Sequence, residues 1–206
     1  AIEINPDFAE AHSNLGIILK DLGKLKEAEL SLRKAIEIKP DYAEAHSNLG
    51  NVFRDLGKLK EAEVSQRKAI ELNPNFAEAY SNLGNILKDV GKLKEAELSI
   101  CKAIDIQPDF AKNYFQKGII LQLLRRYEDA IVSYNKASEL EPENPQYYKF
   151  KGLQLFNFYR ESLAKNNNLI KSINQCDWEK SKKLLTKTCI SAPLYTKENV
   201  SEFIKL

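Results

Sequence analysis

Apolar and polar positions along the chain repeat with a period of 34 residues. In the first period, apolar or small residues recur every three or four positions in two stretches, one at about 9–21 and one from Leu25 to Ile36. This spacing gathers them on one face of a helix, so each stretch predicts an amphipathic helix. Gly23 separates the stretches, and Pro40 prevents the second helix from continuing. Each period therefore predicts a helical hairpin.

Prolines mark the same frame, because one returns every 34 residues, at Pro6, Pro40, Pro74, Pro108 and Pro142. A fixed period of this size is typical of stacked repeat architectures. Four complete units occupy 9–42, 43–76, 77–110 and 111–144, and we number the positions within each unit from 1 to 34. Residues 1–8 match the end of a preceding repeat, and 145–206 form a divergent fifth repeat with a basic, helical C-terminal segment. We therefore expect the chain to be part of a longer protein.

Small residues recur at position 8 of each unit. In a helix interior glycine costs about 1 kcal/mol relative to alanine, so its return at one position needs a geometric reason. Close approach of the two helices of a hairpin provides one. The series is Gly16, Gly50, Gly84, Gly118 and Gly152.

The combined pattern resembles the tetratricopeptide repeat family over residues 1 to about 156. In the second unit the residues that carry the resemblance are His46, Leu49, Gly50, Gly57, Ala62, Ala69 and Pro74. The resemblance implies an all-α, right-handed superhelical solenoid of antiparallel helix pairs, closed by a divergent helical cap. It also implies a scaffold that binds an extended peptide or a partner protein in a concave groove lined by the first helix of each unit.

In this family, positions 2, 5, 6, 9, 12 and 13 face the groove. An asparagine amide both donates and accepts hydrogen bonds, so a row of asparagines can pair with the backbone of an extended peptide. The alternative is that the row consists of solvated surface residues inherited by duplication. Lysine or arginine alternates with aspartate at the rim, which predicts a polar and nearly charge-balanced groove. The predicted groove residues are Asn14, Asn48, Asn51, Asn82, Asn85, Lys112 and Gln116.

Some domains of this family hold a C-terminal carboxylate with a clamp of basic and asparagine residues. Carried onto this chain, that clamp would use Ser47, Asn51, Asn82, Lys112 and Gln116. Ser47 and Gln116 stand where basic residues belong, so much of the charge-assisted hydrogen bonding is lost. We expect no such clamp here.

Charge and motif content narrow the function classes. Residues 145–206 carry 11 Lys and Arg against 5 Asp and Glu, which leaves 20 against 24 in residues 1–144. No dense basic stripe appears, which disfavours nucleic-acid binding. His12 and His46 share position 4, and the later units carry tyrosine there, so packing is a better interpretation than metal binding. No catalytic motif or cofactor-binding loop is recognisable, so we expect neither catalysis nor a cofactor in these residues.

Cysteine usage and hydropathy suggest a cytoplasmic protein without a membrane span. Cys101, Cys176 and Cys189 form no CxxC pair, which fits a reducing compartment. No apolar run approaches the length of a transmembrane helix. The chain is expected to be a monomer or a weak homodimer. The convex face or the apolar helix after Pro145 could mediate the dimer contact, although burial of that helix under the basic tail is the preferred interpretation.

A second functional hypothesis assigns the repeats to a larger enzyme. The Ser-Asn-Leu-Gly segments at 13–16, 47–50 and 81–84, together with Cys-Asp-Trp at 176–178, resemble the repeat region and linker of O-linked N-acetylglucosamine transferase-like proteins. This resemblance implies a substrate-recognition arm whose glycosyltransferase catalytic domain lies beyond residue 206.

Overall fold

The computed structural model describes residues 8–165, and all regular secondary structure in that range is α-helical. This confirms the all-α prediction. The amphipathic stretches become helices close to their expected limits, and a proline starts the ninth helix. The described helices are α1 (Ala9–Asp21), α2 (Leu25–Ile38), α3 (Ala43–Asp55), α4 (Leu59–Leu72), α5 (Ala77–Val90), α6 (Leu93–Ile106), α7 (Ala111–Leu123), α8 (Tyr127–Leu140) and α9 (Pro145–Lys165).

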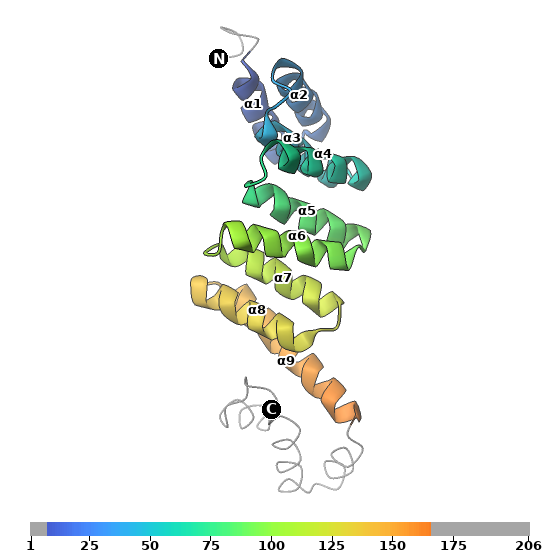
Figure 1. Ribbon diagram of the computed structural model, residues 1–206, viewed down its shortest axis with the longest axis vertical. Coiled ribbons are helices and arrows are strands. Elements are labelled where there is room, and N and C mark those ends of the chain that lie inside the picture. The colour runs from blue at the N-terminus through green and yellow to red at the C-terminus, as the bar shows by residue number, and fades with distance from the viewer. Residues whose placement is uncertain (1–7, 166–206) are drawn as a thin grey trace, which may run out of the picture. The chain divides into compact units, whose positions relative to one another are not determined.

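The first eight helices form four hairpins that stack on one another (Figure 1). α1 packs on α2, α3 on α4, α5 on α6 and α7 on α8, and the second helix of each hairpin also packs on the first helix of the next. These hairpins belong to one compact unit that ends at Lys151, whereas α9 continues into a second unit. Short turns join the two helices of each hairpin, so neighbouring helices run antiparallel. The result is the predicted tetratricopeptide-type solenoid.

The glycines at position 8 allow the two helices of each hairpin to pack closely. A Cβ atom added to Gly84 would lie 2.6 Å from Cδ1 of Ile100, and one on Gly118 would lie 2.5 Å from Cε1 of Tyr134. Gly16 and Gly50 face position 24 of their own hairpins in the same way. At Gly152 no described atom lies within 4 Å of such a Cβ, so the predicted close contact is not found there. The described chain holds no second helix after α9 for Gly152 to meet.

Glycine also sets the turn inside the first three hairpins. Gly23, Gly57 and Gly91 have φ angles of 74°, 75° and 86°, in the left-handed region where an L side chain is disfavoured. In the fourth hairpin Arg125 occupies the equivalent position and keeps the turn with a φ of 61°. The turn is therefore preserved without its glycine, at a cost in backbone strain.

Replacing Arg125 with glycine is expected to stabilise the protein by about 0.5–1 kcal/mol. The left-handed conformation costs an L residue about 1–2 kcal/mol, and glycine removes this cost. The greater conformational freedom of glycine in the unfolded chain offsets part of that gain. Urea unfolding followed by circular dichroism measures the change. Gly57→Ala is the matched control, because it introduces the same strain into the second hairpin and should destabilise. A loss of stability in the Arg125 variant would contradict the prediction.

Ion pairs connect each repeat to the next at equivalent positions. Glu29 pairs with Lys58 at 2.9 Å, Glu63 with Lys92 at 3.1 Å and Glu97 with Arg126 at 2.8 Å. The hydrogen bond from Lys58 and the nearby Arg33 hold the pKa of the Glu29 carboxyl below its usual value, although partial burial opposes this shift. Exposed ion pairs of this kind contribute about 0–1 kcal/mol each. They favour the repeat register more than they stabilise the array.

The fourth repeat replaces polar contacts with an aromatic cluster. Phe115 stands where the earlier repeats carry serine, and its ring lies 5.7 Å from that of Tyr134 and 5.0 Å from that of Phe150. Tyr147 joins the cluster and donates its hydroxyl to Glu141 at 2.9 Å. Phe150, which was expected in an apolar end helix, is therefore part of the core of this unit. Of the cap predicted at 145–206, residues 166–206 lie outside the described residues.

Candidate peptide-binding groove

The first helices of the repeats line a hollow of about 470 Å³. Asn14 of α1 and Asn48 and Asn51 of α3 contribute to its wall, and Asn14 is exposed whereas the other two are half-buried. Tyr42 and Phe76, the residues just before α3 and α5, line it as well. This hollow, which we call the groove hollow, brings together three of the seven predicted groove residues.

A second hollow of about 230 Å³ lies further along the array, between α5 and α7. Asn82 and Lys112 line it, next to Phe110. Asn85 is half-buried and lines neither hollow. Two more of the predicted residues therefore border a space that could accept a ligand.

Hydrogen bonds between repeats hold the position-6 side chains. Nδ2 of Asn48 donates to Oγ of Ser13 at 3.5 Å, and Nδ2 of Asn82 donates to Oγ of Ser47 at 3.4 Å. Each serine belongs to the preceding repeat. These bonds are long and therefore weak, and each leaves the amide oxygen of the asparagine available. The row is thus oriented by the array and keeps its acceptors for a ligand.

Gln116 continues the row with a different geometry. Its Oε1 accepts a hydrogen bond from Oγ of Ser81 at 2.7 Å, and only 8% of its surface is exposed. Among the seven predicted residues it is the buried one. The accessible part of the row therefore ends before the fourth repeat.

Sequence reasoning missed Gln66, which supports the groove from behind. This side chain of α4 is fully buried at position 24, where Leu32 and Ile100 stand in neighbouring repeats. Its Oε1 accepts from Oγ of Ser47 at 2.9 Å, and its Nε2 donates to the Ser47 carbonyl oxygen at 2.8 Å and to Oδ1 of Asn51 at 3.1 Å. The signal was present, because a glutamine interrupts an otherwise apolar position.

The charged side chains at the rim of the groove are paired with one another, whereas two glutamates of its wall are not. Asp89 pairs with Arg54 at 2.7 Å and with Lys88 at 3.1 Å, and the equivalent Lys20 and Asp21 also pair with each other, so the rim charges largely neutralise one another. Glu44 and Glu78 of the hollow wall form no ion pair within residues 8–165. Burial, followed by the charges of Glu44 and Glu10, raises the pKa of Tyr42. The groove is therefore more acidic than expected.

The residues of the hypothetical carboxylate clamp are engaged within the protein. Ser47 is 1% exposed and bonded to Gln66, Gln116 is bonded to Ser81, and the amide oxygen of Asn51 accepts from Gln66. Lys112 is exposed but lies beside the smaller hollow. Among the five clamp positions, this arrangement offers a terminal carboxylate one cation.

The structure gives the position-4 histidine a structural partner. His46 hydrogen-bonds the carbonyl oxygen of Pro40 through Nε2 at 2.9 Å, which ties α3 to the loop before it. Within residues 8–165, no group of three or more His, Cys, Asp or Glu side chains is placed to hold a metal ion. None of the helices in that range combines the length and the apolar character that crossing a bilayer requires.

Family models for tetratricopeptide repeats match the chain from its first residue to residue 144. A model described as TPR repeat matches residues 18–57 and 50–91. Two models described as tetratricopeptide repeat match residues 77–110 and 111–144 in one case and 1–29 in the other. A search of curated protein sequences gives no significant match.

Solved structures with similar folds include MamA, which is 27% identical with a TM-score of 0.63 over 70% of this chain and 85% of that chain. YrrB, described as a TPR protein with an unusual peptide-binding site, is 21% identical with a TM-score of 0.62 over 100% of this chain and 96% of that chain. A mutant O-GlcNAc transferase from Thermobaculum terrenum is 21% identical with a TM-score of 0.59, over 64% of this chain and 26% of that chain. At these identities the last two show the fold alone.

Proposed function

The chain belongs to the tetratricopeptide repeat family, and we propose that it is a protein-interaction module whose groove hollow binds an extended segment of a partner protein. The observation that carries the proposal is a hollow of about 470 Å³ lined by asparagine amides from successive repeats. That volume lies within the range of pockets that bury a ligand. The peptide-binding site named for YrrB, a protein of the same fold, supports this assignment.

The bound segment would be held through its backbone. Asn48 and Asn82 occupy the same place in consecutive repeats, and each keeps its amide oxygen for a backbone N–H of the ligand. Asn14 lies one repeat before them and is exposed, with no hydrogen-bond partner within residues 8–165. Backbone pairing of this kind accepts many sequences. The unpaired Glu44 and Glu78 would favour segments without acidic side chains at the groove edge.

The Asn48→Ala, Asn82→Ala double variant tests the proposal. Peptides selected from a random library against the parent protein should bind the double variant about 5- to 150-fold more weakly, because each of the two lost hydrogen bonds contributes about 0.5–1.5 kcal/mol. Isothermal titration calorimetry measures the two affinities. Equal affinity for parent and variant would show that the asparagine row is not the binding surface.

A matched control separates binding from folding. Asn75→Ala, Asp109→Ala changes two exposed residues at equivalent positions of the same two repeats, outside the groove hollow and the smaller hollow. Peptide affinity should not change in this control. Urea unfolding of all three proteins measures how much stability the Ser13 and Ser47 contacts contribute, so that a loss of binding is not mistaken for a loss of structure.

The enzyme-arm hypothesis remains an alternative proposal. The Cys-Asp-Trp segment on which it rests lies outside the described residues, and the likeness to the Thermobaculum terrenum enzyme concerns the fold. Reading the coding sequence beyond the codon for Leu206 would test the enzyme-arm hypothesis. A glycosyltransferase domain there would support this alternative, and its absence would exclude it.

A further inference from the structure

Position 22, in the second helix of each of the four repeats, carries an exposed apolar side chain. The four residues have exposed fractions of 69%, 68%, 71% and 53%, and none of them lines the groove hollow. Soluble proteins commonly expose single apolar side chains, but contiguous apolar surface indicates an interaction site. The row consists of Leu30, Val64, Leu98 and Val132.

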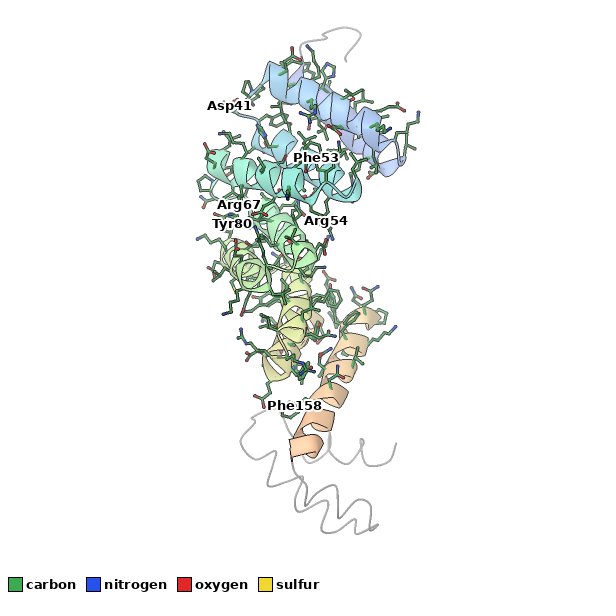
Figure 2. The ribbon with its side chains drawn as sticks, turned by 90° about the vertical axis from the view of Figure 1, so that its right-hand side faces the viewer. Asp41, Phe53, Arg54, Arg67, Tyr80 and Phe158 are labelled. Carbon is green, nitrogen blue, oxygen red and sulfur yellow. The ribbon has the colours of Figure 1, made fainter. Side chains whose placement is uncertain are left out.

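At Leu98 the row borders a hollow of about 420 Å³ between α4, α5 and α6, which we call the outer hollow. Ile70 and Leu83 form its apolar wall together with Leu98. Arg67, Glu71 and Tyr80 also line it, and Figure 2 shows Arg67 and Tyr80 beside each other where α4 meets α5. The charges of Arg67 and Glu71 are already paired, Arg67 with Glu63 and Glu95 and Glu71 with Lys68. The volume is sufficient for a large aliphatic or aromatic side chain.

Two polar groups at the outer hollow lack the partners that their counterparts have in the preceding repeat. His46 bonds the carbonyl oxygen of Pro40, whereas the hydroxyl of Tyr80, at the same position one repeat later, has no hydrogen-bond partner within residues 8–165. Lys68 pairs with Glu71 at 2.8 Å, whereas the equivalent Lys102 forms no ion pair in that range. A donor and a cation are therefore available to a ligand.

Further lysines extend the positive charge along this surface. Lys60 and Lys94 precede Val64 and Leu98 by one helical turn, so they lie on the same face of α4 and α6. Both are exposed, and neither forms an ion pair within residues 8–165. A surface that combines unpaired lysines with an apolar hollow is complementary to an acidic segment with an apolar anchor.

We propose that the outer hollow binds an acidic segment of a partner protein. The segment inserts a large apolar side chain between Ile70, Leu83 and Leu98, and its carboxylates pair with Lys94 and Lys102. Tyr80 donates its hydroxyl to a carbonyl or carboxylate oxygen of the segment. This site is separate from the groove hollow and does not depend on the function proposed for it.

Charge and sequence argue for this occupant and for this repeat. Residues 166–206 of the chain itself carry 7 Lys and 4 Asp or Glu, so the lysines would repel rather than attract that segment. In the following repeat, Lys117 replaces the leucine of the apolar wall and Cys101 replaces Arg67. The features needed for an acidic, apolar-anchored ligand therefore coincide at the outer hollow.

The test uses short synthetic peptides of aspartate and glutamate around one central phenylalanine. Two counterparts carry lysine at every acidic position or alanine in place of phenylalanine. The acidic phenylalanine peptide should bind about tenfold more tightly than either counterpart, and added salt should weaken it. Methyl NMR signals of Ile70, Leu83 and Leu98 should shift on binding. An acidic peptide that does not bind, or binds no more tightly than its lysine counterpart, would overturn the proposal.

Variants locate the site. Leu98→Ser and Lys102→Glu change exposed side chains, and each should lower affinity for the acidic phenylalanine peptide by about tenfold. Val132→Ser is the matched control, because it makes the same kind of change in the next repeat, where the apolar wall is interrupted; it should have no effect.

Binding that survives Leu98→Ser but is lost in Asn48→Ala, Asn82→Ala would place the peptide in the groove and refute the proposal. A concentration-dependent dimer that Leu98→Ser abolishes would refute it too, since the occupant would then be a second copy.

Discussion

Replacing Gly118 with leucine is expected to lower the free energy of unfolding by about 3 kcal/mol, the upper end of what overpacking usually costs. A Cβ atom at this position would already lie 2.5 Å from Cε1 of Tyr134, closer than van der Waals contact permits. The Tyr134 side chain is fully buried and packs against Phe115 and Phe150, so it has no open space into which it could move. The hairpin of α7 and α8 must therefore separate. Urea unfolding followed by circular dichroism measures the loss.

The neighbouring residue provides the control for this variant. Lys117 is half-buried and stands at position 7, where Leu15, Leu49 and Leu83 occur in the other repeats. Lys117→Leu introduces the same side chain one residue away and should leave stability unchanged or raise it. The contrast isolates the steric effect from the general effect of leucine on a helix. If the Gly118 variant were as stable as the parent, close helix packing would not be the reason for the glycine.

Gln66→Ala is expected to cost about 3 kcal/mol as well. The substitution empties a fully buried site, and shortening a buried side chain to alanine typically costs about 2–5 kcal/mol. It also removes the acceptor of the Ser47 hydroxyl and the donor that Asn51 accepts from. Part of the cost thus comes from polar groups that lose their partner. Chemical denaturation of the variant and the parent gives the difference.

Gln66→Leu separates packing from hydrogen bonding at this site. Leucine fills the same position in the first repeat, so the cavity term largely disappears and a cost of about 1 kcal/mol remains for the unpaired serine. This variant also releases the amide oxygen of Asn51 toward the groove hollow. We expect alanine, leucine and glutamine at position 66 to rank in that order of increasing stability, and an alanine variant as stable as the parent would contradict this account.

The helical hairpins and their solenoid arrangement could be predicted from the sequence because they depend on features that recur. Leucine, alanine and glycine return at fixed positions, so any one repeat supports the interpretation of the others. Arg125 illustrates the reverse case. Arg125 stands where the other three hairpins have glycine, yet the turn keeps a left-handed φ of 61°. The packing of α7 on α8 outweighs the preference of one L residue for a negative φ.

The candidate site was only partly predictable, since a repeat pattern indicates which face a residue is on but not which partner it finds. The row of asparagines was foreseen, but the burial of Gln116 depends on Ser81 of the preceding repeat, at 2.7 Å. The acidity of the groove edge was missed for a similar reason. It follows from Glu44 and Glu78, which form no ion pair within residues 8–165, whereas Asp89 at the rim pairs with Arg54 and Lys88.

The serine–asparagine contacts have a consequence for how the length of the groove can change. Asn48 bonds Ser13, and Asn82 bonds Ser47, so each contact reaches one repeat back and no further. If residues 43–76 were excised, Asn82 would come to lie opposite Ser13 and could form the bond that it lost with Ser47. A duplicated repeat would be accepted in the same way. Recombination between repeats can therefore lengthen or shorten the binding surface in whole steps without new compensating substitutions at the junction.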